Sequence, residues 1–357
     1  MTPPPLIHLY VNPVDDCNLA CSHCWIAPCR SGEPFATRKR KANEFSPVQF
    51  SMLLDQAAEL GLKYVKFTGG EPLLREDFPK LYHIASEHSA GLGVNIETNG
   101  TLEPKDLWKA FERNRPDSVA VSLDSVKPLV HDDFRNTPGA WKRTVAFIEN
   151  LVDLEINTQV IMSTADFRAE PVLEMAAFCD KSGVSSLKIN PVQPIGRGTG
   201  MNTPALGMKK ILKFSKQVFA KCGNSVRLDL PPALMPLSRL PQAGHCPIHN
   251  LLGILPDGGV SFCGIGFSCQ ELVMGNFLRK SLRIIWKDSP ILKKIRRQLP
   301  KELRGICSNC VHSNSCLARC VMQNYYSCGG FTASYWMCNA ADEEGLFPKT
   351  RKINGNA

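Results

Sequence analysis

The stretch "VDDCNLACSHCWIAPCR", residues 14–30, decides how the rest of the chain is interpreted. Three of its four cysteines, Cys17, Cys21 and Cys24, follow the spacing Cys-x3-Cys-x2-Cys. Three thiolates in one short loop can bind a four-iron cluster and leave one iron without a protein ligand, whereas a closed zinc site needs four protein ligands. An open coordination position indicates chemistry rather than a purely structural metal site.

The segment around this loop alternates short apolar runs with helical patterns. Six β-branched-rich runs, at 6–11, 64–70, 93–100, 118–124, 158–164 and 187–192, are predicted to be buried strands. Helical patterns at 46–62, 76–90, 104–115, 139–154 and 170–183 separate them. With right-handed crossovers, this order predicts an α/β fold, a partial (β/α)6 TIM-like barrel with its functional groups at the C-terminal strand ends.

Composition excludes several classes of protein. No segment of the 357 residues approaches the ~20 apolar residues that cross a bilayer, and no basic region precedes the first apolar run, so a cytoplasmic protein without a membrane partner is expected. In a reducing compartment, 15 cysteines favour metal or cluster ligation over disulfides. The basic segments 38–41 and 292–304 are interpreted as solvated surface, with an acidic partner as the alternative; no nucleic-acid-binding module accompanies the net charge of +9.

The three-cysteine loop after the first predicted strand resembles the signature of the radical S-adenosylmethionine (radical SAM) superfamily. The resemblance implies a [4Fe-4S] cluster whose open iron binds S-adenosyl-L-methionine, and reductive cleavage of that cofactor to a 5′-deoxyadenosyl radical. An external electron donor such as flavodoxin or ferredoxin is then required. The alternative interpretation of the loop is a zinc knot or incidental cysteines.

Motifs at later strand ends strengthen this resemblance. "TGGEP" (68–72) is similar to the superfamily's glycine-rich cofactor motif, and "ETNG" (97–100), "SLD" (122–124) and "DDFRNTPGAW" (132–141) follow the next strands. The alternative for each motif is simple turn chemistry. The cofactor-binding residues that the resemblance implies are Gly69, Gly70, Glu71, Pro72, Thr98, Asn99, Ser122, Asp124, Arg135 and, near adenine, His23. Arg197 is either a further cofactor contact or a structural loop residue.

The C-terminal part is cysteine-dense and resembles the SPASM extension of radical SAM enzymes, which binds up to two auxiliary four-iron clusters. The resemblance implies two auxiliary [4Fe-4S] clusters. The distal one would be held by Cys307, Cys310, Cys316 and Cys338, and the proximal one by Cys246, Cys263 and Cys320. The fourth proximal ligand is Cys269, Cys222 or none, and Cys29 is interpreted as a spare thiol.

The expected organisation is a radical SAM partial barrel at 1–200, a bridging region at 201–240, a SPASM domain at 241–345 and a polar tail at 346–357. Polar residues of the fifth and sixth strands, Gln159, Asn190 and Gln193, are expected to face the barrel mouth, although core packing explains them as well.

The predicted function is oxidative cross-linking of side chains in a ribosomally made precursor peptide, as in the peptide-modifying maturases that the chain resembles. A separate leader-binding protein is a further expected partner. The alternatives are oxidation or dehydration of a small molecule, such as an aminoglycoside or nucleoside sugar, and a non-enzymatic iron–sulfur or zinc scaffold. The open loop together with "GGEP" favours an enzyme over a scaffold.

Overall fold

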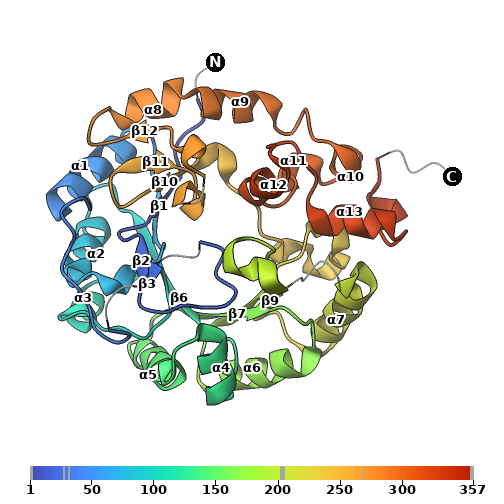
Figure 1. Cartoon of the computed structure of the whole chain (residues 1–357), viewed down its shortest axis with the longest axis horizontal. Helices are drawn as coiled ribbons and strands as arrows, with labels where there is room; N and C mark the ends of the chain where they lie inside the picture. Colours follow the sequence, from blue (N-terminus) through green and yellow to red (C-terminus); the bar gives the residue numbers. More distant parts are fainter. Residues whose placement is uncertain (1–2, 27–28, 31–32, 202–205, 268, 354–357) are drawn as a thin grey trace.

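A twisted sheet forms the centre of the molecule, and helices surround it (Figure 1). The computed structural model describes residues 3–26, 29–30, 33–201, 206–267 and 269–353. The strand order is β12-β11-β10-β1-β4-β5-β6-β7-β8-β9. The strands are β1 (His8–Val11), β4 (Tyr64–Phe67), β5 (Gly93–Thr98), β6 (Ser118–Ser122), β7 (Thr158–Thr164), β8 (Ser186–Pro191), β9 (Val226–Leu228), β10 (Leu251–Ile254), β11 (Gly259–Ser261) and β12 (Gly275–Asn276), with β2 (Asp16–Cys17) and β3 (Cys29–Arg30) as a separate pair.

All six predicted strands are confirmed as β1 and β4 to β8, and they pair in parallel in chain order. Two additions lie outside the prediction. At one edge β9 extends the sheet, and at the other β10 pairs in parallel with β1, followed by antiparallel β11 and β12. The C-terminal half therefore completes the same sheet as the N-terminal half. The domain boundaries expected from the sequence stay a prediction.

The helices lie outside the sheet as expected for βα units. Ser46 caps α1 through a capping box with Gln49, and Pro47 occupies the first turn. The helices are α1 (Pro47–Ala58), α2 (Phe78–Ser86), α3 (Leu107–Arg113), α4 (Pro128–Arg135), α5 (Ala140–Asp153), α6 (Ala169–Lys181), α7 (Met208–Lys221), α8 (Leu282–Asp288), α9 (Pro290–Gln298), α10 (Gly305–Ser308), α11 (Ser313–Cys316), α12 (Val321–Cys328) and α13 (Trp336–Glu343).

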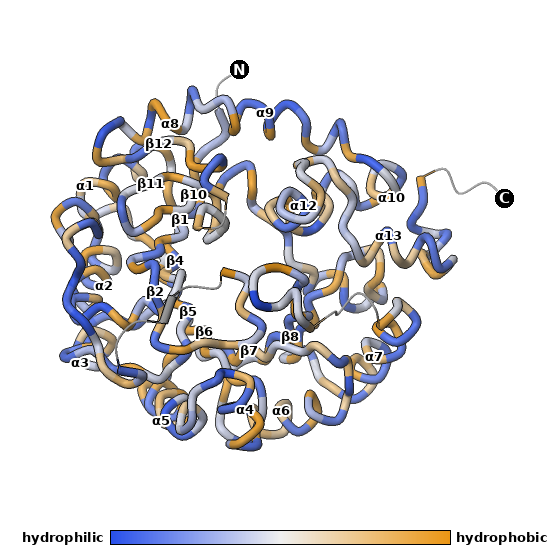
Figure 2. The backbone as a smooth tube through the Cα atoms, in the orientation of Figure 1, coloured by the Kyte–Doolittle hydropathy of each residue, from blue (hydrophilic) through white to orange (hydrophobic). Residues whose placement is uncertain are grey.

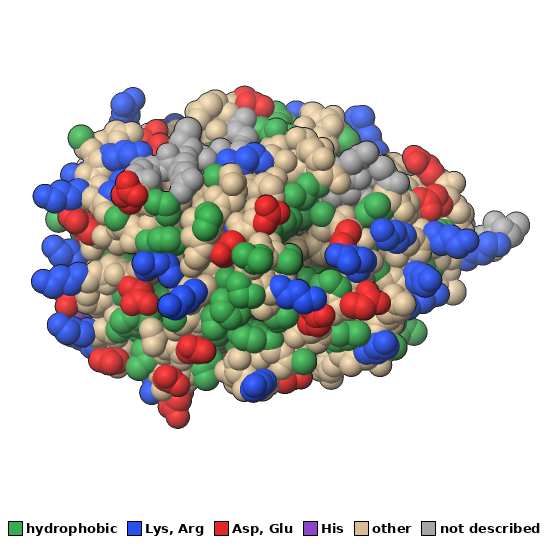
Figure 3. Space-filling model, turned by 60° about the horizontal axis from the view of Figure 1, so that its bottom comes forward, with side chains coloured by type: hydrophobic (Ala, Val, Ile, Leu, Met, Phe, Trp, Pro, Cys, Tyr) green, Lys and Arg blue, Asp and Glu red, His purple; other side chains and the backbone are tan. Residues whose placement is uncertain are grey.

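The second basic segment, residues 292–304, has its lysines at the surface, as the sequence predicts. In α9, Leu292 and Ile295 are buried while the lysines face outward, and Figure 2 shows the hydrophilic character of this helix. On the face shown in Figure 3, basic and acidic side chains are interspersed around hydrophobic ones. That face carries no large patch of side chains with one sign of charge. A nucleic-acid-binding surface would require such a patch of positive charge.

In the part of the chain that the structure describes, no helix combines the length and the apolar character needed to cross a bilayer.

Candidate functional site: three cysteine groups at the barrel mouth

The first cysteine group lies at the C-terminal end of β1. Cys17 and Cys21 are buried beside Leu19, and Cys24 packs against them. The backbone N–H of Cys24 donates to the carbonyl of Cys21 (3.3 Å), so the loop curls into a turn. The loop itself therefore gathers the three thiols in one place.

The basic segment 38–41 holds this loop in place. Arg38 donates to both oxygens of Asp16 and pairs with Glu44, and Lys41 Nζ lies 2.9 Å from Asp16 Oδ2. Both acidic residues are buried. The interpretation of residues 38–41 as merely solvated surface is therefore wrong for Arg38, whose side chain neutralises buried carboxylates beside Cys17, whereas Lys41 is exposed as expected and adds a contact to Asp16.

The spacing of the sulfur atoms distinguishes a cluster from a single ion. A tetrahedral zinc site would hold its sulfurs about 3.8 Å apart, given Zn–S bonds of about 2.3 Å. Among the residues that the structure describes, no cysteine group brings three ligand atoms within 4.8 Å of one another; Asp15, Asp16 and Glu44 form the one group that does. Cysteines spaced more widely than in a closed zinc site are compatible with a cluster, in which each thiolate binds a different iron.

The "GGEP" motif packs directly onto the cysteine loop. A Cβ at Gly70 would lie 1.8 Å from the carbonyl oxygen of Asp16, and Gly69, at φ +118°, lies against Asn12. The backbone N–H of Glu71 donates to the same Asp16 carbonyl (3.1 Å). The two glycines therefore allow close approach of the motif to the loop that carries Cys17.

Glu71 joins the ends of two strands. Its carboxylate accepts hydrogen bonds from the hydroxyl of Thr98 (2.7 Å), the backbone N–H of Asn99 (2.7 Å) and that of Leu73 (3.0 Å). Burial raises the pKa of Glu71 to about 7, although these three donors act in the opposite direction. Pro72 begins the short turn that follows. The side chain of Asn99 continues the network, with Nδ2 3.9 Å from Cys17 Sγ.

The motifs "SLD" and "DDFRNTPGAW" connect to the second cysteine of the loop, Cys21. Arg135, at the end of α4, donates through Nε to Asp124 (2.6 Å) and through Nη1 to Cys21 Sγ (3.5 Å). Burial is the largest influence on the pKa of Asp124 and would raise it, but Arg135, His23 and His131 together with the hydrogen bond from Ser163 outweigh burial and hold that pKa below its usual range. Ser163 also donates its backbone N–H to Asp124 (2.9 Å), and Ser122 ends the same strand, β6.

His23 stacks on Phe134, with ring centroids 4.3 Å apart. Burial lowers the pKa of His23 to about 4, so the ring is neutral at pH 7. Its Nδ1 is buried without a partner among the described residues. Arg197 donates through Nε to the Cys21 carbonyl (2.7 Å), which supports the structural alternative for this residue.

The four cysteines assigned by resemblance to the distal cluster surround one small cavity, together with Ile306 and Ala318. Cys307 comes from α10, Cys316 from α11 and Cys338 from α13, and Cys310 lies in the loop between the first two of these helices. The thiols of Cys307 and Cys338 are hydrogen-bonded to each other. Cys307 and Cys338, which are 31 residues apart in sequence (338 − 307), thus converge as the sequence predicts; cluster ligation itself stays a prediction.

The proximal group also converges. The thiols of Cys246, Cys263 and Cys320 lie within electrostatic range of one another, and burial followed by the charges of the other two raises the pKa of Cys246. Deprotonation of such buried thiols is favoured by a bound metal, which releases the protons. Cys222 lies beside Arg239 at the end of α7, and Cys269 lies beside Glu271, so the fourth proximal ligand stays a prediction. The side chain of Cys29 lies outside the described residues.

A cavity of about 250 Å³ lies between the first and the proximal group. We call it the reaction cavity. Its walls come from the cysteine loop, from the ends of β7 and β8 and from the C-terminal half of the chain. The lining residues are His23, Trp25, Ser163, Asn190, Pro191, Val192, Gln193, Ile195, Asp229, Cys263, Cys320, Met322 and Gln323.

Of the strand residues expected at the barrel mouth, Asn190 and Gln193 line the reaction cavity, whereas Gln159 lies deeper in the barrel. Sequence reasoning missed Asp229, the one carboxylate among the residues lining the cavity, which pairs with Arg319. It also missed Asn18, which accepts from Asn99 (2.9 Å) next to Cys17. The position of Asn18 directly after a motif cysteine was an available signal.

Comparison with known protein families gives two matches. A sequence model of the radical SAM superfamily matches residues 11–179, and one of the SPASM iron–sulfur cluster-binding domain matches residues 246–311. The two matches together include most of the cysteines discussed above.

Individual relatives match over nearly the whole chain. The AdoMet-dependent heme synthase of Methanosarcina barkeri is 26% identical over 333 residues, covering 88% of this chain and 91% of that protein. The mycofactocin maturase MftC of Mycobacterium tuberculosis is 26% identical over 322 residues, covering 87% of this chain and 77% of that protein. Among solved structures, SuiB of Streptococcus suis bound to its precursor peptide SuiA shares the fold, with a TM-score of 0.71 and 17% sequence identity. The match covers 93% of this chain and 75% of that chain.

Proposed function

The chain belongs to the radical SAM superfamily and carries a SPASM domain, and we propose that this enzyme oxidatively cross-links side chains of a ribosomally made precursor peptide. One observation carries the proposal: the reaction cavity is bounded by the three-cysteine loop on one side and by Cys263 and Cys320 on the other. A substrate there would contact both the place where a radical is generated and a place where an electron can leave.

The cofactors of the enzyme are a [4Fe-4S] cluster, S-adenosyl-L-methionine and auxiliary iron–sulfur clusters. When bound, the first cluster and S-adenosyl-L-methionine supply a 5′-deoxyadenosyl radical, and the auxiliary clusters supply an electron acceptor. In the proposal Cys17, Cys21 and Cys24 hold the first cluster. The hydrogen-bonded frame of Glu71, Thr98, Asn99, Asp124 and Arg135 fixes their loop against the strand ends.

In the proposal, the remaining residues of the reaction cavity bind the substrate. A new bond between two side chains would require the substrate to lose one hydrogen atom to the radical that the bound cofactors supply, and then one electron and one proton. Asp229 borders the cavity as a carboxylate. Trp25, Val192, Ile195 and Met322 give the cavity apolar walls that exclude water from a reactive intermediate.

Two kinds of relative bear on the substrate. MftC is a maturase, and the fold is shared with SuiB, which was solved with a precursor peptide. The heme synthase match, covering 91% of that protein, favours a second candidate, the oxidation of a small molecule in the same cavity. Flavodoxin or ferredoxin as electron donor and a separate leader-binding protein are part of the proposal.

The test is co-production of the enzyme, under anaerobic conditions, with each short peptide encoded beside its gene. Mass spectrometry should find one peptide that has lost two hydrogen atoms. The Cys17→Ala variant should abolish this change and the release of 5′-deoxyadenosine, whereas Cys328→Ala, an exposed cysteine outside the three groups, should preserve both. If no peptide changes mass while deoxyadenosine is still released, the small-molecule candidate replaces peptide cross-linking.

A further inference from the structure

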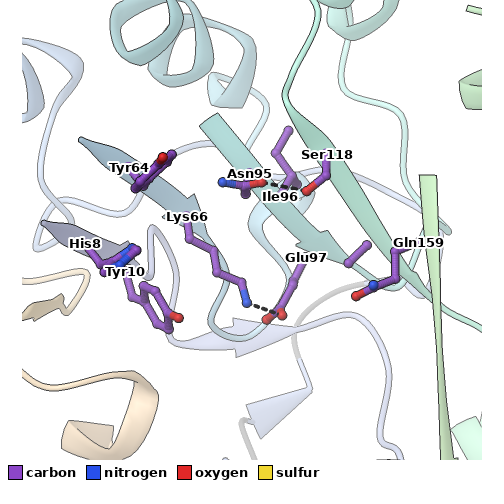
Figure 4. A pocket seen from close by; sticks show the side chains of 10 residues that line it. His8, Tyr10, Tyr64, Lys66, Asn95, Ile96, Glu97, Ser118 and Gln159 are labelled. Carbon is purple, nitrogen blue, oxygen red and sulfur yellow. Dashed lines mark hydrogen bonds and ion pairs between the residues drawn. The ribbon is translucent and has the colours of Figure 1, made fainter. Parts of the chain in front are cut away.

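The inner face of the barrel is polar, unlike the apolar packed interior of a closed TIM barrel. Side chains alternate along each strand, so Tyr10, Lys66, Asn95 and Ser118, which are partners in register across β1, β4, β5 and β6, share one face. Below the reaction cavity they enclose a space of about 300 Å³, which we call the barrel chamber (Figure 4). Its lining is His8, Tyr10, Tyr64, Lys66, Asn95, Ile96, Glu97, Ser118, Ala120 and Gln159.

One cation of this chamber is already neutralised. Lys66 forms an ion pair with Glu97, which Figure 4 shows, and its ammonium lies 5.1 Å from the centre of the Tyr10 ring. Lys66 is also within electrostatic range of Cys263 of the proximal group. Its charge therefore has partners within the protein.

Lys188 is a second cation of the interior, without such a partner. It lies on β8 in register with Ile161 of β7 and Arg227 of β9. Two residues before it, Ser186 accepts a hydrogen bond from Gln159 of the chamber (2.9 Å); two residues after it, Asn190 lines the reaction cavity. Lys188 is thus placed between the two spaces.

No hydrogen bond or ion pair joins the side chain of Lys188 to any residue that the structure describes. Burial is the largest influence on it and lowers its pKa, and Lys66, Arg319 and Arg227 add to this effect, while Glu97 alone opposes it. Glu97 is already paired with Lys66, and Asp229 with Arg319. An ammonium in this position is unfavourable unless an anion joins it.

We propose that the barrel interior at Lys188 binds a carboxylate group of the substrate, with Asn190, which lines the reaction cavity, as the neighbouring amide donor. One ammonium with an amide donor suits a monoanionic carboxylate. The inference rests on the proposed function only in taking the ligand to be part of the substrate. The carboxylate belongs either to an acidic side chain of a peptide or to a small organic acid.

The test measures binding without turnover, by calorimetric titration of the reconstituted enzyme in the absence of S-adenosyl-L-methionine. The probes are glutarate, the minimal peptide acetyl-glutamate-amide, and acetyl-glutamine-amide as the neutral control. Lys188→Met should weaken binding of the acidic probe roughly tenfold or more, because a charge-assisted hydrogen bond is lost. Lys142→Met, an exposed lysine on α5, should bind as the wild type does.

A gain of affinity provides a readout that misfolding cannot imitate. Glu97→Gln removes the carboxylate that opposes an anion and frees Lys66, so acidic probes should bind this variant more tightly than the wild type. Binding of acetyl-glutamate-amide would identify a peptide side chain, and binding of glutarate alone a small acid. Failure of both acidic probes to bind, or equal binding by Lys188→Met, would overturn the inference, while a peptide mass change would still support the proposed function.

Discussion

The guanidinium of Arg135 and the carboxylate of Asp124 form a buried ion pair, with Nε 2.6 Å from Oδ2. The second arm of the same guanidinium reaches Cys21 Sγ at 3.5 Å. A single side chain at the end of α4 therefore links the fourth predicted strand to the cysteine loop. The position of Arg135 therefore depends on Asp124, which is itself almost fully buried.

Replacing Asp124 by Asn should leave the Arg135 charge buried without a counter-charge. The free energy of unfolding, from urea titration, should fall by about 3 kcal/mol. Asp166→Asn is the matched control, because it removes the acid of an exposed pair with Arg168 and should leave the stability within experimental error. Equal stability of Asp124→Asn and wild type would mean that the pair does not support the loop.

Gly70→Ala should disrupt the contact between "GGEP" and the cysteine loop, because the added Cβ would lie 1.8 Å from the Asp16 carbonyl oxygen. The expected loss of stability is about 3 kcal/mol, with reduced binding of S-adenosyl-L-methionine in equilibrium dialysis. At Gly330 a Cβ would meet nothing within 4 Å, so Gly330→Ala should retain both properties. Normal cofactor binding by Gly70→Ala would contradict the role assigned to this contact.

Cys310→Ala should lower the iron content by about four per chain and reduce the melting temperature, because the helices around the distal group would lose a bound cluster. Cys222→Ala should keep the full iron content, since Cys222 lies beside Arg239, away from the three groups. Iron analysis and a thermal melt of the reconstituted proteins measure both. A loss of iron in Cys222→Ala would instead make Cys222 the missing proximal ligand.

His131 should make stability depend on pH. Its Nδ1 accepts from the backbone N–H of Asp124 (3.2 Å), and burial lowers its pKa to about 4. The unfolded chain, with a histidine pKa of about 6.5, binds more protons below that pH, so the stabilisation is complete above pH 6.5 and declines as the pH falls toward 4. Between pH 7.5 and 5 the loss from this residue should be about 2 kcal/mol.

His131→Asn keeps a hydrogen-bond acceptor but does not titrate. Urea unfolding at the two pH values should therefore show a smaller loss in this variant than in the wild type. The exposed His83, replaced by Asn, is the control and should leave the pH dependence unchanged. An identical pH dependence in His131→Asn and wild type would show that His131 does not titrate as its burial requires.

α4 shows why parts of the site escaped sequence analysis. Leu129 and Val130 of this helix are 84% and 55% exposed, whereas His131 and Arg135 are buried. This is the reverse of the apolar pattern that identifies a surface helix. The helix buries its polar residues because they bind Asp124, a contact that hydrophobic periodicity does not represent.

The sequence by itself determined the parallel strands and the grouping of Cys17, Cys21 and Cys24, because strand periodicity and loop spacing are local properties of the chain. The other two cysteine groups were implied by the resemblance to the SPASM extension. Only the tertiary structure decided that β10 pairs with β1, where Asn12 donates to the carbonyl of Ile254 242 residues away. It also decided that Lys188 faces the interior near Glu97, and that Cys263 and Cys320 border the same cavity as His23. Such contacts arise when distant segments pack together, and no local pattern specifies which buried polar groups will then be neighbours.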